Sequence, residues 1–116
     1  MDRPTLDELL EAVAEFLERE VLPALTDPRL RFQTLVALNA LGIARRQVAL
    51  GEDLEAEERR ALTELLGEEG EVDALLTSLA LRIRQGHAPP GTFAYLKAHV
   101  VRKLKVANPK YLERYP

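Results

Sequence analysis

Apolar residues recur at helical spacing through most of the chain. The first stretch places them three and four residues apart on one side: Leu6, Leu9, Leu10, Val13, Phe16, Leu17 and Val21. That spacing is typical of an amphipathic helix with one buried face. Four further stretches follow, so we predict an all-α bundle of about five helices over approximately residues 5–22, 28–50, 54–66, 71–85 and 92–107.

Short motifs mark the ends of these helices. Thr5 and Glu8 form a capping box at the first start, and Asp27 before Pro28 is a favoured start for the second. Pro23 is expected to end or kink the first helix. Other positions are assigned by residue type: Asp53 and Thr92 are predicted caps, and Gly51, Gly67 and Gly86 are predicted helix ends. Residues from about 108 onwards are predicted to form a short aromatic tail.

The stretch 28–50 is apolar on almost every side, which is typical of a helix buried among neighbours. We therefore predict that it is the central helix of a single domain spanning residues 1–116. Gly42 would leave room for another backbone. Asn39 is its one interior polar side chain and is expected to be hydrogen-bonded, either as a structural contact or as the lining of a pocket; we favour the structural contact.

The other helices are expected to present one apolar face inward and one charged face outward. The last two helices are predicted to bury two sets of residues: Val72, Leu75, Leu76, Leu79, Ala80 and Ile83, and then Phe93, Leu96, Val100 and Leu104. In the third helix, a run of charged residues is expected to be solvated: Glu55, Glu57, Glu58, Arg59 and Arg60.

Composition limits the class of protein. The chain has 116 residues, enough for one self-supporting domain, and no cysteine, so disulfides and thiolate metal sites are excluded. The acidic start is unlike a signal peptide, and no apolar run reaches the ~20 residues of a membrane helix. We therefore expect a cytoplasmic protein that does not enter membranes. Arginine outnumbers lysine twelve to four, which suggests a GC-rich genome and a thermophilic source.

Charge is distributed unevenly. Residues 1–80 carry eight Lys/Arg and eighteen Asp/Glu, whereas residues 81–116 carry eight Lys/Arg and one Glu. The basic end either pairs internally with the acidic part or binds an anion or an acidic partner; internal pairing is favoured. Nucleic acid is not expected as a partner, because the whole chain is acidic and no recognition motif is present.

No catalytic or metal-binding pattern is visible. There is no glycine-rich phosphate loop, no HExxH motif, and no base beside the single serine, Ser78. His87 and His99 are twelve residues apart and form a poor metal pair. We predict no cofactor, no metal and no independent enzyme activity.

Polar residues near the C-terminus are the strongest candidates for a binding surface. Arg82 and Arg84 stand near the end of the fourth helix, where the helix dipole also favours cations. Arg102 and Lys103, with Asn108, Lys110 and Tyr111, are expected to cluster around the end of the fifth helix. The N-terminal segment contributes one further candidate for this binding surface, Arg3.

Several segments together resemble a known family. They are Arg3–Thr5, Glu15–Leu17 through Glu20–Leu25, Ala37–Leu41, Arg82–Gly86 and Val101–Leu112, of which the Asn-Pro-Lys-Tyr-Leu ending is the most specific. The chain is similar to small bacterial helical domains of unknown function that are fused to, or encoded beside, aminoglycoside-phosphotransferase-like kinases, often near acyl-CoA dehydrogenases.

The resemblance implies a setting and no mechanism. We expect a non-catalytic accessory or interaction domain that works in trans with such a kinase in acyl-CoA-linked metabolism. The alternative is a small-ligand binder for an anionic acyl-CoA or phosphorylated metabolite, with the cationic residues meeting phosphates and Asn39 lining the apolar part. Self-association is also open, because a short leucine-rich helix can leave an apolar face uncovered.

Overall fold

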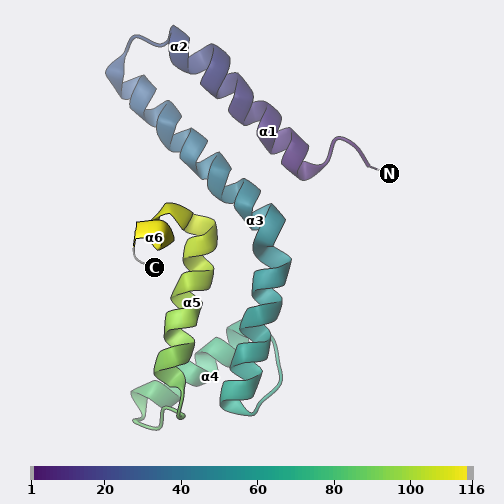
Figure 1. Ribbon diagram of the computed structural model, residues 1–116, viewed down its shortest axis with the longest axis vertical. Helices are drawn as coiled ribbons and strands as arrows, with labels where there is room; N and C mark the ends of the chain where they lie inside the picture. The colour runs from purple at the N-terminus through teal and green to yellow at the C-terminus, as the bar shows by residue number, and fades with distance from the viewer. Residues whose placement is uncertain (1, 115–116) are drawn as a thin grey trace. The chain divides into compact units, whose positions relative to one another are not determined.

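The structure is a computed structural model in which residues 2–114 are described (Figure 1). Its elements are α1 (Leu6–Phe16), the π-helical turn η1 (Leu17–Val21), α2 (Leu22–Ala24), α3 (Pro28–Leu66), α4 (Val72–Arg84), α5 (Thr92–Ala107) and α6 (Pro109–Arg114). No strand occurs among the described residues, and the predicted all-α class is confirmed. The chain divides into two compact units: unit 1 ends at Leu50 and unit 2 begins at Gly51. That residues 1–116 form a single domain stays a prediction.

The first helix of unit 1 begins and ends as its sequence predicts. The Thr5 hydroxyl accepts a hydrogen bond from the Glu8 amide at 3.2 Å, and the Glu8 carboxylate accepts one from the Thr5 amide at 2.9 Å. At the other end, Pro23 has no N–H to donate to the carbonyl of Arg19, and its ring would clash with that carbonyl. The helix widens there into the π-turn η1, in which the Leu22 amide donates to Leu17. Helix α2 then ends at Ala24, so the prediction for Pro23 is confirmed.

Helix α3 begins as predicted but continues much further. The Asp27 carboxylate accepts from the Arg29 amide at 2.9 Å, and Pro28 is the first residue. The predicted break at Gly51 and the predicted cap at Asp53 are wrong, because α3 is helical for 39 residues through both. A glycine inside a helix costs only about 1 kcal/mol relative to alanine, and the helix-forming residues on either side outweigh that cost.

The expected buried position of the 28–50 helix is also wrong. No side chain among residues 2–50 is fully buried, Phe32 is 67% exposed, and Asn39 is exposed. A Cβ atom at Gly42 would meet the Arg46 guanidinium at 3.5 Å and no neighbouring backbone among the described residues. Unit 1 is a helical hairpin, and two helices bury only the faces they turn toward each other.

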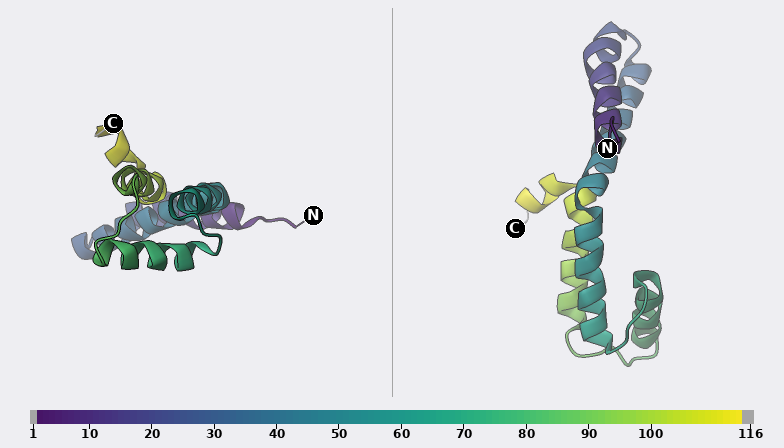
Figure 2. Two further views of the ribbon diagram at one scale, coloured as in Figure 1. Left: turned by 90° about the horizontal axis from the view of Figure 1, so that it is seen from below. Right: turned by 90° about the vertical axis from the view of Figure 1, so that its right-hand side faces the viewer.

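Unit 2 contains the buried core, which is formed by Leu62, Leu66, Leu75, Leu79 and Tyr95. Figure 2 shows α5 alongside the second part of α3, with α4 crossing both on one side. Gly67 and Gly86 follow α3 and α4 with φ of +68° and +79°, and both predicted ends are confirmed. After α4, the amides of Gly86 and His87 donate to the carbonyls of Ile83 and Arg82, which is the Schellman pattern.

The last two helices differ from their predictions at their ends. Gly91, with φ of +91°, occupies the N-cap of α5, and Thr92 is the first helical residue; its hydroxyl donates to the Pro89 carbonyl at 2.6 Å. The predicted tail is instead helix α6, since Pro109 suits a first helical position. Residues 115–116 of that tail lie outside the described residues. No helix in residues 2–114 is long and apolar enough to cross a membrane.

Candidate docking groove

Helix α5 turns a polar face toward the interior of unit 2. Tyr95, His99 and Arg102 follow one another at spacings of four and three residues and meet Glu58 of α3. The Arg102 guanidinium donates to Glu58 Oε1 from Nε at 2.9 Å and from Nη2 at 2.5 Å. The His99 Nδ1–H donates to Glu58 Oε2. Only 10% of the Glu58 side chain and 13% of the Arg102 side chain are exposed, so this is a buried ion pair.

The surroundings of Glu58 determine its charge. Burial alone would raise its pKa, but the hydrogen bonds from Arg102 and His99 outweigh burial and hold the pKa below its ordinary value. Burial, and then the nearby Glu58 carboxylate, raise the pKa of Tyr95. The Tyr95 ring stacks on His99 and lies under the Arg102 guanidinium, at 5.9 Å and 5.7 Å between centres. Its hydroxyl makes no hydrogen bond of good geometry among the described residues. This cluster stabilises the α3–α5 contact.

The apolar face of α5 is turned outward instead. Phe93 is 76% exposed and Val100 is 53% exposed, so the prediction that they are buried with Leu96 and Leu104 is wrong. The physical reason is the Glu58 ion pair, whose partners occupy the opposite face of the same helix. Together with α6, the outward face forms an open groove of about 390 Å³ lined by Phe93, Leu96, Lys97, Val100, Val101, Leu104, Tyr111 and Leu112. We call this the α5–α6 groove.

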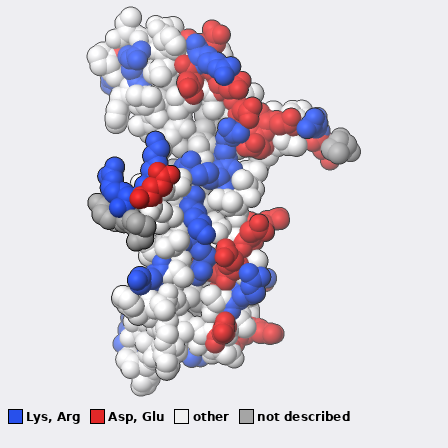
Figure 3. Space-filling view, in the orientation of Figure 1, with Lys and Arg blue, Asp and Glu red and all other residues white. Residues whose placement is uncertain are grey.

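Positive charge surrounds the α5–α6 groove. Lys97 is part of its wall, with its ammonium group 6.0 Å from the centre of the Phe93 ring. Residues 93–114 carry six Lys/Arg and one Glu, but Arg102 is paired with Glu58 of α3, which leaves a net charge of +4 on the exposed side chains. Figure 3 shows Lys and Arg side chains gathered over the end of α5 and over α6. The groove therefore has an apolar floor and a basic rim.

Only some of the residues predicted to form a binding surface lie on the two helices that form the groove. Tyr111 lines the groove, and Asn108, whose carbonyl accepts from the Tyr111 amide at 3.1 Å, connects α5 to α6. Lys103 and Lys110 are exposed on the same two helices. These four residues lie on α5 and α6 or between them, and their role as a binding surface stays a prediction.

The other candidates lie elsewhere. Arg102 is buried against Glu58, and the Arg82 guanidinium donates to the Glu68 carboxylate, which also accepts from Ser78 at 3.3 Å. For these two arginines the charges pair internally. Arg84 is exposed at the end of α4. In unit 1, Arg3 pairs with Glu8 at 3.6 Å, and Asn39 is exposed, so the expectation that Asn39 is buried is wrong.

The expectation that Glu58 is solvated is wrong, because only 10% of its side chain is exposed. Tyr95 and His99 were not singled out from the sequence as structural residues. Two spacing signals point to all three residues. Glu58, Leu62 and Leu66 recur every four residues and are the buried positions of α3. Tyr95, His99 and Arg102 likewise form one helical face with spacing four and three. A carboxylate in phase with leucines indicates that it lies on the buried face of its helix, whereas its partner on another helix is known only from the structure.

The second hollow and the clusters of titratable side chains are weaker candidates for a functional site. An open hollow of about 630 Å³ lies beside the end of α3, but the Arg59–Glu71 ion pair at 3.0 Å neutralises charges on its wall. Among residues 2–114, no three His, Cys, Asp or Glu side chains are placed to hold a metal ion.

Comparison with known protein families gives one match. The family described as a domain of unknown function, DUF6285, matches residues 23–111. The chain belongs to this family. The matched range includes α3, α4, α5 and the first residues of α6, and therefore both Glu58 and most of the α5–α6 groove. No curated protein and no solved structure matches the chain.

Proposed function

We propose that this member of the DUF6285 family is a non-catalytic interaction domain. Its α5–α6 groove would bind an acidic, amphipathic helix of an aminoglycoside-phosphotransferase-like kinase, in trans, in acyl-CoA-linked metabolism. The observation that carries the proposal is the orientation of α5, which buries its polar face and exposes its apolar face. Exposed apolar surface with a polar rim is typical of protein-binding sites.

The choice of an acidic helix rests on charge and shape. An apolar groove between helices accepts the apolar face of another helix, whose anchors repeat at three and four residues. The net charge of +4 on the exposed side chains of residues 93–114 favours Asp and Glu on the flanks of that partner. The kinase is the partner implied by the family resemblance.

Co-expression with an aminoglycoside-phosphotransferase-like kinase of the same organism tests the proposal. We expect the two proteins to co-elute in size-exclusion chromatography at micromolar concentration. The double variant Phe93→Ser/Val100→Asp should abolish the complex, since both side chains are exposed and their loss leaves the core intact. Leu81→Asp is the matched control, because Leu81 is 52% exposed on α4 and does not line the groove. Separate elution of the wild-type proteins would count against the proposal.

A second candidate is a small-ligand binder for an anionic acyl-CoA or phosphorylated metabolite. It is favoured by the groove volume of about 390 Å³ and by Lys97 on its wall. A thermal-shift panel of CoA esters and sugar phosphates separates the two functions. A ligand at 100 times its Kd should add ~2.7 kcal/mol of stability, and Lys97→Met should reduce that gain. A flat response across the panel would exclude this candidate.

A further inference from the structure

Lys97 is the one charged residue among the described residues that line the α5–α6 groove. Its ammonium group lies 6.0 Å from the centre of the Phe93 ring, and no carboxylate of residues 2–114 forms an ion pair with it. We propose that Lys97 determines which helices bind there, by selecting a partner helix that carries an Asp or Glu within its apolar face. The inference rests on the proposed function of the groove and adds the position of one partner residue.

Lys97 lies inside the apolar stripe of α5 and not at its edge. Residues three and four positions apart are neighbours on a helix surface, and those of Lys97 include Phe93, Val100 and Val101. All three line the groove and are exposed. The other lysines of α5, Lys103 and Lys105, are exposed but do not line the groove. A helix that covers the stripe therefore covers Lys97 as well, whereas Lys103 and Lys105 stay at the rim.

The cost of covering an ammonium group decides the chemistry of the partner. A purely apolar helix over Lys97 would remove water from the charge without replacing its hydrogen bonds, which is unfavourable. A carboxylate opposite Lys97 restores the pairing, and a single polar residue in an apolar helical seam fixes partner and register. The partner helix therefore carries one Asp or Glu whose neighbours three and four residues away are apolar. This carboxylate is distinct from the acidic residues on the flanks of the partner, which face the basic rim.

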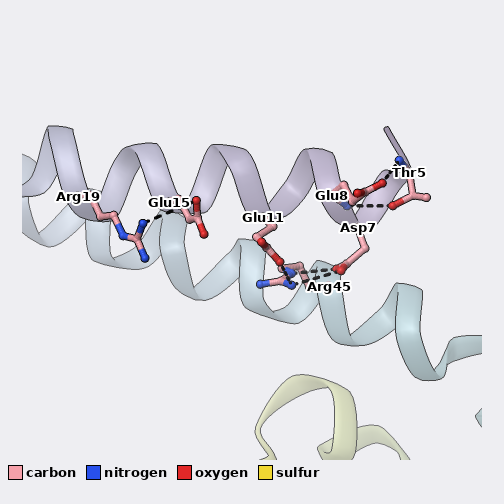
Figure 4. Close-up of polar contacts among 7 residues, drawn as sticks. All are labelled: Thr5, Asp7, Glu8, Glu11, Glu15, Arg19 and Arg45. Carbon is pink, nitrogen blue, oxygen red and sulfur yellow. Dashed lines mark hydrogen bonds and ion pairs between the residues drawn. The ribbon is translucent and has the colours of Figure 1, made fainter. Parts of the chain in front are cut away.

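The acidic helix of this chain, α1, does not supply such a carboxylate. The Arg45 guanidinium donates to Asp7 and to Glu11, each at 2.9 Å (Figure 4). Arg19 pairs with Glu15 at 4.0 Å, and the remaining carboxylate of α1 caps its own helix. The carboxylates of α1 are thus already paired within unit 1. We therefore assign the carboxylate that faces Lys97 to a helix of another protein.

Two synthetic amphipathic helical peptides of identical composition test the proposal. Both carry leucines three and four residues apart; one has Glu at the centre of the apolar face and Gln on the opposite face, and the other has these two exchanged. Because the net charges are equal, general attraction to the basic rim does not separate the peptides. Fluorescence anisotropy with the full chain should show about tenfold tighter binding of the peptide with the inward Glu. This ratio should change little as salt is raised, because the pair is enclosed, while both affinities fall.

Substitutions of Lys97 show whether this residue is responsible for the preference. Lys97→Met should bind the two peptides with equal affinity, and Lys97→Glu should prefer the peptide with the inward Gln. Lys105→Met is the matched control, because it removes one charge from the same helix outside the groove; it should weaken both peptides alike and keep the preference. Both lysines are exposed, so helical circular dichroism should be unchanged in all three variants.

The outcomes separate this inference from the proposed function. Equal affinity of the two peptides for the wild-type chain, or a preference that survives Lys97→Met, would overturn the inference and leave the proposed function standing. Equal affinity is the result expected if the Lys97 ammonium reaches water past the bound helix. Binding of neither peptide would also overturn the inference, while co-elution with the kinase decides the proposed function separately.

Discussion

Glu58 is the residue on which the orientation of α5 depends. Its carboxylate accepts hydrogen bonds from Arg102 and His99, and all three side chains are largely enclosed. A buried ion pair is weak evidence of net stability, because desolvation offsets most of the attraction. We infer that it determines which face of α5 turns inward, since α5 has an apolar face that would otherwise compete for the interior.

Glu58→Gln should therefore destabilise unit 2 strongly. The amide keeps the shape of the side chain but leaves the Arg102 charge buried without its counter-ion, which costs on the order of 3 kcal/mol. Chemical denaturation followed by circular dichroism measures the loss. Glu55→Gln, an exposed carboxylate one turn earlier on α3, is the control and should change stability by less than ~0.5 kcal/mol. Equal effects of the two substitutions on the free energy of unfolding would show that the buried ion pair does not contribute to the stability of unit 2.

The same carboxylate makes stability depend on pH in the acidic range. The folded-state pKa of Glu58 lies below its ordinary value of 4.5, so the folded state binds a proton less readily than the unfolded state. Its contribution is fully present above about pH 4.5 and is lost as the pH falls through the folded-state pKa. The stability difference between wild type and Glu58→Gln should therefore shrink between pH 7 and pH 3. A difference that stays constant over this range would contradict the assignment.

At the scale of the element, local signals predicted some helix starts and ends correctly and others wrongly. The capping box at Thr5 and the Asp27–Pro28 start depend on hydrogen bonds within four residues, and both are present. Gly67 and Gly86 end their helices because each adopts a positive φ. Gly51 has the same residue type but is helical, and nothing local distinguishes it. Whether a glycine ends a helix is decided by the contacts made by the residues after it.

The face that a helix buries was harder to predict than the helix itself. Periodicity gives a stripe, and the usual assumption is that the stripe faces inward. In α4 that assumption holds for Leu75 and Leu79, which belong to the core. In α5 it fails, because the Glu58 ion pair lies on the opposite face, and an ion pair between residues 44 positions apart has no signature in one helix. The α5–α6 groove therefore required the tertiary structure.

Gly42 within α3 and Gly86 after α4 provide a paired test of which glycines are helical and which end a helix. Gly42→Ala should stabilise the chain by up to ~1 kcal/mol, because the position is helical and the nearest atom to the added methyl group is 3.5 Å away. Gly86→Ala should destabilise it by about 1 kcal/mol, because φ is +79° there. Thermal denaturation of the two variants gives the signs. A destabilising Gly42→Ala would indicate a close neighbour at that turn.

At the scale of the whole molecule, burial is concentrated in unit 2. The enclosed apolar side chains are Leu62, Leu66, Leu75, Leu79 and Tyr95, whereas unit 1 has an extended apolar surface. The chain has an ordinary share of apolar residues but a small core. Part of its apolar surface is therefore exposed, where other molecules can bind. The apolar floor and basic rim of the α5–α6 groove support its proposed role as a binding site.

Hydrogen exchange provides the last prediction, because it reports local stability residue by residue. Amides of α4 and of the part of α3 around Leu62 should be the most protected, because these segments belong to the buried core. Amides of α1 should be the least protected, because α1 has no buried residue. Exchange followed by mass spectrometry of peptide fragments measures the difference. Protection in α1 that equals protection in α4 would mean that the hairpin is as stable as the core of unit 2, although it encloses no side chain.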